Sequence, residues 1–231
     1  MTDVTGHPEL ARLTEVMTTL RQRCPWDRQQ THRSLVQYLI EETLEVTEAI
    51  ESGDREHLRE ELGDLLLQVL FHAEIASEDP SGFDLEDVAR GIADKLVDRH
   101  PHVFGSADGT ADPSTGVVDV AELNVTWEQR KAVEKGRSSV LEGIPDQLSA
   151  MAKATKIISR ARSRQVPVPL ESAAVSAAEV GDQVLALVAR AQASGLDAEQ
   201  AVRDAVRDLE AQVRSAEAAA VAAVGADRVA D

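Results

Sequence analysis

Residues 38–64 read YLIEETLEVTEAIESGDREHLREELGD, and this stretch decides the fold. Apolar residues recur there at the three- and four-residue spacing of an α-helix, and a Gly-Asp pair interrupts the pattern. We predict one helix over about 34–52, with a capping box that begins at Ser34, and a second over 54–78 with Asp54 as its N-cap. Since only a tight turn separates them, the two helices are predicted to be antiparallel neighbours.

The two predicted helices carry acidic residues at matching distances from the turn. Glu42 and Glu45 lie about nine residues before it, and Glu61 and Asp64 lie about nine residues after it. An antiparallel pair brings such positions to the same height, so four carboxylates converge. The following residues, 65–73, are apolar nearly all round the helix, which indicates burial. Acidic groups are costly in such a place unless they are paired or bound to a cation.

This convergence of carboxylates predicts a site for a hard divalent cation. Carboxylate ligands select Mg²⁺, with Mn²⁺ as an alternative, and Mg²⁺ keeps water ligands that a substrate phosphate can replace. Through such a metal an acidic protein can bind a polyphosphate and hydrolyse it. The alternative is a noncatalytic helical interaction module whose acids form a solvated face. That alternative predicts that metal leaves the thermal stability unchanged.

The composition favours helices and argues against several classes of partner. Only 3% of the 231 residues are aromatic, and the chain contains 41 acidic residues but only 24 lysines and arginines. A net charge of −17 argues against nucleic acids and membrane surfaces as partners, because both require basic patches. The single cysteine, Cys24, suits a reducing compartment, and the first ten residues do not resemble a signal peptide. We therefore expect a cytoplasmic protein.

The rest of the chain is also predicted to be helical, so the expected fold class is all-α. Further helices are predicted over about 9–23, 84–100, 119–136, 145–164, 171–193 and 197–223. We expect two domains, 1–136 and 137–231, with a mobile loop at 105–118 in the first because that segment is rich in Gly, Ser, Asp and Pro.

The second predicted domain contains a weak repeat of the first. Glu179-Val-Gly-Asp182 and its apolar continuation match Glu61-Leu-Gly-Asp64 at an offset of 118 residues, and the next helix matches as well. No Glu-Glu-x-x-Glu precedes Glu179, and two acids cannot rebuild a site of four carboxylates. We interpret the second domain as a degenerate copy with a structural or dimerising role.

The arrangement Glu41-Glu42-x-x-Glu45 followed by Glu61-x-x-Asp64 resembles the signature of the MazG family of nucleoside triphosphate pyrophosphohydrolases. The resemblance is strong over residues 10–164. Further shared motifs are CPWD at 24–27, TH at 31–32, KLVDRHPHVFG at 95–105, WEQRKAVEK at 127–135 and GIP at 143–145.

This resemblance implies a dimerising helical bundle of the MazG type. It also implies Mg²⁺-dependent hydrolysis of ribo- or deoxyribonucleoside triphosphates between the α- and β-phosphates, which yields a monophosphate and pyrophosphate, in a house-cleaning role for the nucleotide pool. The metal ligands would be Glu42, Glu45, Glu61 and Asp64. Glu42 would also belong to the catalytic group, together with Glu41 as a further ligand or as the base that orients water.

The resemblance further implies contacts to the substrate by basic and aromatic side chains. The phosphates would be met by Lys95, Arg99, Lys131 and Lys135, although ordinary solvated charge explains these residues equally well. Trp26 would stack on the base, or it would serve as an aromatic residue of the core or of a dimer contact.

Overall fold

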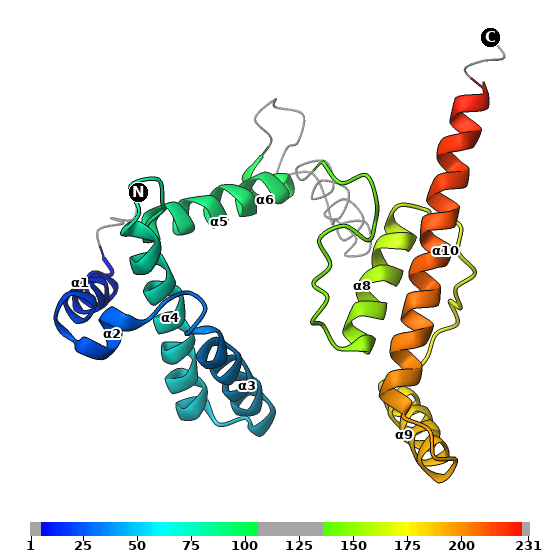
Figure 1. Ribbon diagram of the computed structural model, residues 1–231, viewed down its shortest axis with the longest axis horizontal. Coiled ribbons are helices and arrows are strands. Elements are labelled where there is room, and N and C mark those ends of the chain that lie inside the picture. Colours follow the sequence, from blue (N-terminus) through cyan, green and yellow to red (C-terminus); the bar gives the residue numbers. More distant parts are fainter. Residues whose placement is uncertain (1–5, 106–135, 228–231) are drawn as a thin grey trace. The chain divides into compact units, whose positions relative to one another are not determined.

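The computed structural model describes residues 6–105 and 136–227 (Figure 1). Helices joined by turns and extended segments account for these residues, and no strand occurs among them, which confirms the predicted all-α class. The chain divides into two compact units, 1–112 and 113–231, which we describe separately.

Several sequence predictions fall on residues that the structure does not describe. The helix expected over 119–136 and nearly all of the loop expected at 105–118 lie in this part of the chain. The predicted domain boundary at residue 136 stands at its edge and stays a prediction.

The first unit is built around one long helix, α4, which contacts α1, α3 and α5. The helices of this unit are α1 (Pro8–Arg23), α2 (Pro25–Gln29), α3 (Val36–Ser52), α4 (Arg55–Ser77), α5 (Leu85–Arg99) and α6 (Pro101–Phe104). Three neighbouring helices explain why residues 65–73 are apolar nearly all round. The core of the unit consists of buried Met17, Leu35, Leu70 and Phe71, with Leu13, Tyr38, Leu66, Leu67, Ile75 and Leu85 packed against them.

The α3–α4 hairpin is formed as predicted, with the two helices side by side and antiparallel (Figure 1). Gly53 ends α3 in the left-handed region at φ 74°, where a side chain would be strained. Asp54 then caps α4, since its Oδ1 accepts hydrogen bonds from the backbone N–H groups of Glu56 at 3.0 Å and His57 at 3.2 Å. The turn is therefore fixed from both of its ends.

The predicted capping box at Ser34 is wrong. Ser34 instead forms a reciprocal turn with Thr31, in which each hydroxyl accepts a hydrogen bond from the other residue's backbone N–H, at 2.9 and 3.1 Å. Because these groups satisfy one another locally, Ser34 does not cap the helix, and α3 begins at Val36 after an N-cap, Leu35, that offers no side-chain hydrogen bond.

Two short helices, α2 and α6, were not predicted, and each begins at a proline. Arg21 of α1 holds the segment that contains α2 by donating to the carbonyl oxygens of Asp27 and Gln30. The same guanidinium forms an ion pair with Glu78 at the end of α4, at 2.5 Å. A single partly buried arginine therefore ties three elements together.

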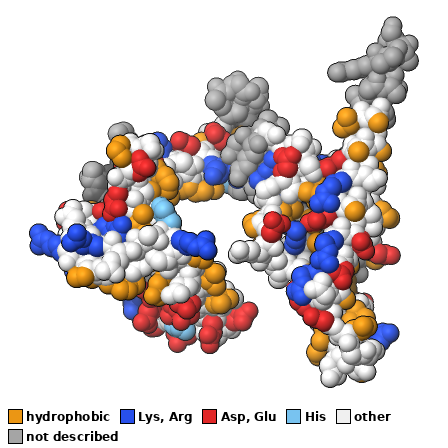
Figure 2. All heavy atoms as spheres, in the orientation of Figure 1, with side chains coloured by type: hydrophobic (Ala, Val, Ile, Leu, Met, Phe, Trp, Pro, Cys, Tyr) orange, Lys and Arg blue, Asp and Glu red, His pale blue; other side chains and the backbone are white. Residues whose placement is uncertain are grey.

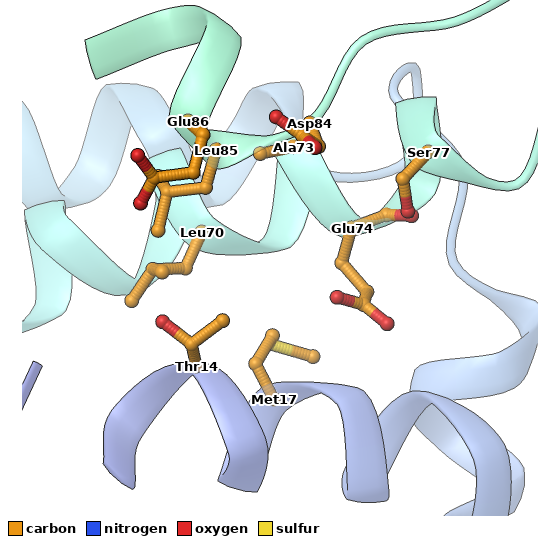
Figure 3. Close-up of a pocket in the computed structure, with 9 residues that line it drawn as sticks. All are labelled: Thr14, Met17, Leu70, Ala73, Glu74, Ser77, Asp84, Leu85 and Glu86. Atoms are coloured by element: carbon orange, nitrogen blue, oxygen red, sulfur yellow. The ribbon is translucent and has the colours of Figure 1, made fainter. Parts of the chain in front are cut away.

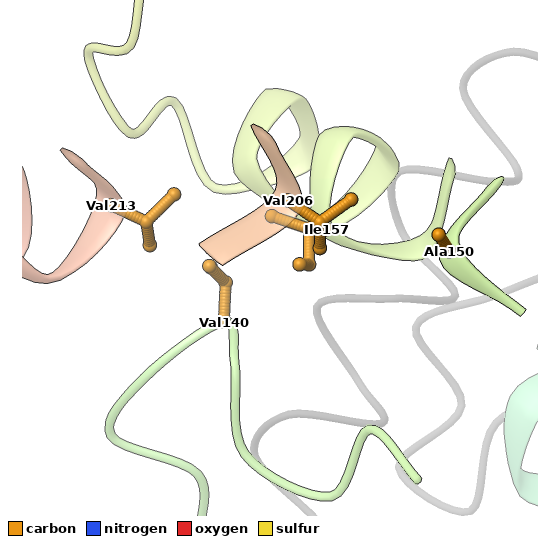
Figure 4. Close-up of a cluster of buried hydrophobic side chains, with 5 residues drawn as sticks. All are labelled: Val140, Ala150, Ile157, Val206 and Val213. Atoms are coloured by element: carbon orange, nitrogen blue, oxygen red, sulfur yellow. The ribbon is translucent and has the colours of Figure 1, made fainter. Parts of the chain in front are cut away.

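The second unit contains α8 (Ala150–Ser163), α9 (Ala177–Ala193) and α10 (Ala198–Asp227). Its buried cluster joins α8 and α10 to the segment before α8 (Figure 4). The members of the cluster are Val140, Ala150, Ile157, Val206 and Val213. An extended segment over 166–176 precedes α9, at the place where the first unit has α3 before α4. None of the described helices is long and apolar enough to cross a membrane.

The basic residues of α8 serve the fold of their own unit. Buried Arg160 donates to the carbonyl oxygens of Val140 at 2.9 Å and Glu142 at 2.8 Å. Lys153 forms an ion pair of 2.8 Å with Glu210 of α10. Arg160 and Lys153 therefore stabilise the packing of the second unit.

A histidine pair ties the segment before α3 to α4. The Nδ1 atoms of His32 and His72 lie 2.8 Å apart, in rings within 6° of parallel. Such a contact is a hydrogen bond only while one of the two nitrogens lacks a proton. Burial, and then the neighbouring His32, lower the pKa of His72.

We therefore predict that acid destabilises the first unit through His72. The unfolded chain binds a proton at His72 from about pH 6.5 downward, whereas the folded chain binds it only at a lower pH. The free energy of unfolding therefore falls as the pH drops from about 6.5 toward the lowered pKa of His72 in the folded chain. Urea unfolding at pH 7.5, 6.5 and 5.5 should show a smaller fall in His72→Gln than in wild type. His7→Gln, at an exposed position, is the control, and equal falls in all three proteins would contradict the prediction.

Candidate metal centre

Three acidic side chains of the hairpin converge at one place. Glu42 and Glu45 of α3 and Glu61 of α4 each offer a carboxylate oxygen, and these oxygens all lie within 4.8 Å of one another. Figure 2 shows acidic side chains gathered over this hairpin. Glu61 is only 8% exposed, whereas Glu45 is open to solvent. The carboxylate cluster is therefore buried on the side of Glu61 and exposed to solvent on the side of Glu45.

The carboxylates of the cluster repel one another. Burial raises the pKa of Glu42, and the charges of Asp64 and Glu45 raise it further. Burial also raises the pKa of Glu61, with the charge of Glu45 as the next cause. Because neighbouring negative charge disfavours the ionised forms of Glu42 and Glu61, a cation among these oxygens would stabilise those forms.

The structure places Asp64 beside this cluster and Glu41 at its outer side. Asp64 lies one turn after Glu61, is half-buried, and its charge acts on both Glu42 and Glu61. Glu41 is exposed and does not belong to the set of three oxygens. Thus three of the four predicted ligands are brought together, the charge of the fourth acts on Glu42 and Glu61, and Glu41 is exposed.

The oxygen atoms of this cluster fit a hard cation. All three candidate ligand atoms are carboxylate oxygens, which is the donor set that Mg²⁺ and Mn²⁺ prefer. Elsewhere on α4, one turn beyond Asp64, Gln68 has a buried amide oxygen with no hydrogen-bond partner among the described residues. The donor chemistry of these residues therefore agrees with the predicted kind of metal.

Sequence reasoning missed His57, which contacts the cluster directly. Its Nε2 lies 3.0 Å from Oε1 of Glu61, and His57 opposes the rise in the pKa of Glu61. The two residues are four positions apart on α4, so the spacing of neighbours on one helix face could have indicated the pair.

The two predicted phosphate-binding residues that the structure describes, Lys95 and Arg99, lie on a helix that does not pack against α3. Lys95 and Arg99 lie half-buried on α5, and among the described helices α5 packs against α4 and α6 but not against α3. Lys131 and Lys135 lie outside the described residues.

Trp26 packs against aromatic residues of the first unit, which is one of the two interpretations that the sequence left open. Its ring packs edge-to-face against Tyr38, with centroids 5.9 Å apart, and against Phe71 at 6.3 Å. The side chain is nevertheless 50% exposed. One side of Trp26 therefore belongs to the core of the first unit, and the rest is available for another contact.

A cavity of about 160 Å³ lies on the other side of α4 (Figure 3). Leu70, one of its lining residues, follows Glu61 by nine positions, which corresponds to half a turn around the helix. The cavity is lined by Thr14, Met17, Leu70, Ala73, Glu74, Ser77, Asp84, Leu85 and Glu86. None of the predicted site residues is among them, so this cavity is separate from the carboxylate cluster.

The acids of the second unit do not form a comparable cluster. Glu179 and Asp182 are exposed on α9, and Glu179 accepts a hydrogen bond of 3.1 Å from Gln183. In the described part of this unit no three acidic or histidine side chains converge as they do in the first.

Comparison with known proteins agrees with the resemblance seen in the sequence. A profile of the MazG nucleotide pyrophosphohydrolase domain matches residues 30–104, which contain all the carboxylates of the cluster. An uncharacterized 26.1 kDa protein of Streptomyces cacaoi is 44% identical over 210 residues, which cover 90% of this chain and 82% of that protein.

Two of the similar proteins are named nucleoside triphosphate pyrophosphohydrolases. The Mycobacterium tuberculosis protein is 37% identical, with 94% of this chain and 60% of that protein covered. The Escherichia coli K12 protein is 43% identical, with 66% of this chain and 57% of that protein covered. The chain thus spans somewhat less than two thirds of each of these proteins.

We predict that removing one charge from the cluster stabilises the metal-free protein. In EDTA, Glu45→Gln should unfold at a higher temperature than wild type, because the charge of Glu45 disfavours ionised Glu42 and Glu61. Added Mg²⁺ should stabilise wild type more than the variant. Thermal unfolding with Glu15→Gln on α1 as control measures both effects, and a Glu45→Gln protein that is less stable in EDTA would contradict the prediction.

Proposed function

Because the chain belongs to the MazG family, we propose that it is a nucleoside triphosphate pyrophosphohydrolase. The reaction cleaves a ribo- or deoxyribonucleoside triphosphate between the α- and β-phosphates and releases a monophosphate and pyrophosphate. The observation that carries the proposal is the convergence of three carboxylate oxygens within 4.8 Å on the α3–α4 hairpin. The names of the relatives support the reaction class.

In this proposal Glu42, Glu45, Glu61 and Asp64 hold Mg²⁺, for which Mn²⁺ can substitute. A bound divalent cation neutralises phosphoryl charge and thereby makes the phosphorus open to attack by water. The hairpin supplies the preorganisation, because its turn sets the height of the two helices and the buried side of the cluster keeps Glu61 in place.

Further residues of the chain are assigned roles around this cluster. Glu41 is exposed beside Glu42, and we assign it the acceptance of a proton from the attacking water. The exposed part of Trp26 offers a surface for the base, backed by Tyr38 and Phe71.

The phosphates require cations that the carboxylate cluster does not provide. We assign this role to Lys95, Arg99, Lys131 and Lys135. Since α5 has no contact with α3 in the chain itself, we propose that Lys95 and Arg99 reach the phosphates from a second copy of the protein.

An exposed apolar face of α3 supports this homodimer. The sequence places Val36, Ile40 and Leu44 on one side of the helix, and they remain 48%, 52% and 63% exposed. A stripe of this kind is typical of a surface that another protein covers. In a symmetric dimer the same stripe from both copies would pack together.

We propose a cytoplasmic enzyme that removes unwanted nucleotides from the precursor pool. Nucleoside triphosphates are made and used in that compartment, and Cys24 is a free thiol, as expected under reducing conditions.

Pyrophosphate release is the measurement that tests this function. Wild-type protein incubated with a panel of ribo- and deoxyribonucleoside triphosphates should release pyrophosphate with Mg²⁺ and none with EDTA. Glu42→Gln and Asp64→Asn should abolish turnover, because each removes a carboxylate from the proposed ligand set. Glu179→Gln is the matched control and should keep full activity. Orthophosphate as the product, or equal release in EDTA, would contradict the proposal.

The proposed dimer is tested by sedimentation velocity. Wild type should sediment as a dimer, and Leu44→Glu should sediment as a monomer, because a charge would be buried in the stripe. Leu10→Glu, a substitution at an apolar residue of α1 that is 50% exposed, is the control and should remain a dimer. A monomeric wild type, or a dimeric Leu44→Glu, would count against this interface.

A further inference from the structure

His57 occupies a fixed position next to the carboxylate cluster. Its backbone N–H donates to the cap residue Asp54, so the first turn of α4 holds it in place. From there its Nε2 reaches Oε1 of Glu61, one helical turn later, at 3.0 Å. The cap at Asp54 thus positions His57, and His57 in turn contacts Glu61, the most buried carboxylate of the cluster.

The contact is distinctive because Glu61 is otherwise surrounded by like charge. The charges that disfavour its ionised form are those of Glu45, Asp64 and Glu60. His57 is the group that acts on it in the opposite sense. An ionised carboxylate only accepts hydrogen bonds, so the imidazole nitrogen must be the donor when Glu61 is charged.

We propose that His57 is a positioning residue of the metal site, which orients the carboxylate of Glu61 by donating an Nε2–H hydrogen bond to one of its oxygens. This inference rests on the proposed function, since it takes the cluster to be a divalent-cation site. The ligand atoms that converge within 4.8 Å are all carboxylate oxygens, so His57 acts through Glu61 and does not itself bind the metal.

The chemical consequence is a carboxylate ligand with a defined orientation. With Oε1 engaged by His57, the free rotation of the Glu61 side chain is restricted and its other oxygen remains for the cation. Hydrogen-bond partners of metal ligands usually change metal affinity by about ten- to a hundredfold when they are removed. The effect belongs to His57 specifically, because neighbouring Arg59 pairs with Glu56, 2.7 Å away, at the exposed side of the helix.

Direct measurement of Mn²⁺ binding tests this role without recourse to catalysis. Free Mn²⁺ is followed by electron paramagnetic resonance during titration of the full chain at pH 8. We expect His57→Ala to raise the Kd by about tenfold. His57→Gln should recover most of the affinity, because its amide is also a donor at a similar distance from the backbone. Arg59→Ala, which removes a full positive charge from the same turn, should bind Mn²⁺ as wild type does.

Each outcome bears on a different part of the inference. A His57→Ala protein that binds Mn²⁺ like wild type overturns the role of His57 and leaves the proposed function intact. Equal weakening in His57→Ala and His57→Gln also overturns it, because a hydrogen-bond donor would then not be what matters. A wild-type protein that binds no Mn²⁺ overturns the metal site, and the role of His57 with it. Thermal unfolding in EDTA shows whether each variant is folded.

Discussion

The repulsion between carboxylates on two packed helices is the constraint on which the rest of the first unit depends. Glu42, Glu45 and Glu61 are held together although the charge of Glu45 disfavours the ionised forms of both Glu42 and Glu61. The opposing stabilisation comes from elsewhere, chiefly from the apolar stretch of α4 that three other helices cover. The turn at Gly53 and the cap at Asp54 then fix the height of the two helices, so the acids cannot slide past one another.

The hairpin could be predicted from the sequence because its signals are local. A glycine that ends one helix, an aspartate that caps the next, and apolar spacing on both sides act within a few residues. The start of α3 was mispredicted for the same reason, since Ser34 has the residue type of a cap but pairs with Thr31 instead. The short helix α2 depends on Arg21, which belongs to another helix, and a contact of that kind leaves no periodic trace in the sequence.

In the candidate site, too, the residues with local signals could be predicted, and those that depend on contacts between helices could not. Residues that share the hairpin, such as Glu42 and Glu61, could be placed together by counting from the turn. The same count applies to His57, which lies one helical turn before Glu61 on α4. Lys95 and Arg99 could not be placed, because their approach depends on how α5 leaves α4, which no local signal specifies. Lys131 and Lys135 stay predictions.

The distribution of charge connects these results. Of the excess of 17 acidic residues, eight fall within 38–64, because this stretch contains ten acidic residues and only two arginines. A merely solvated surface would not need to bury Glu61 to 8% exposure or to place it against two other carboxylates. The second unit, by contrast, has an extended segment instead of a helix before α9, and its two acids stay exposed. The carboxylates whose repulsion opposes folding are therefore concentrated on two helices that pack together. A cation bound at the same place would reduce that repulsion.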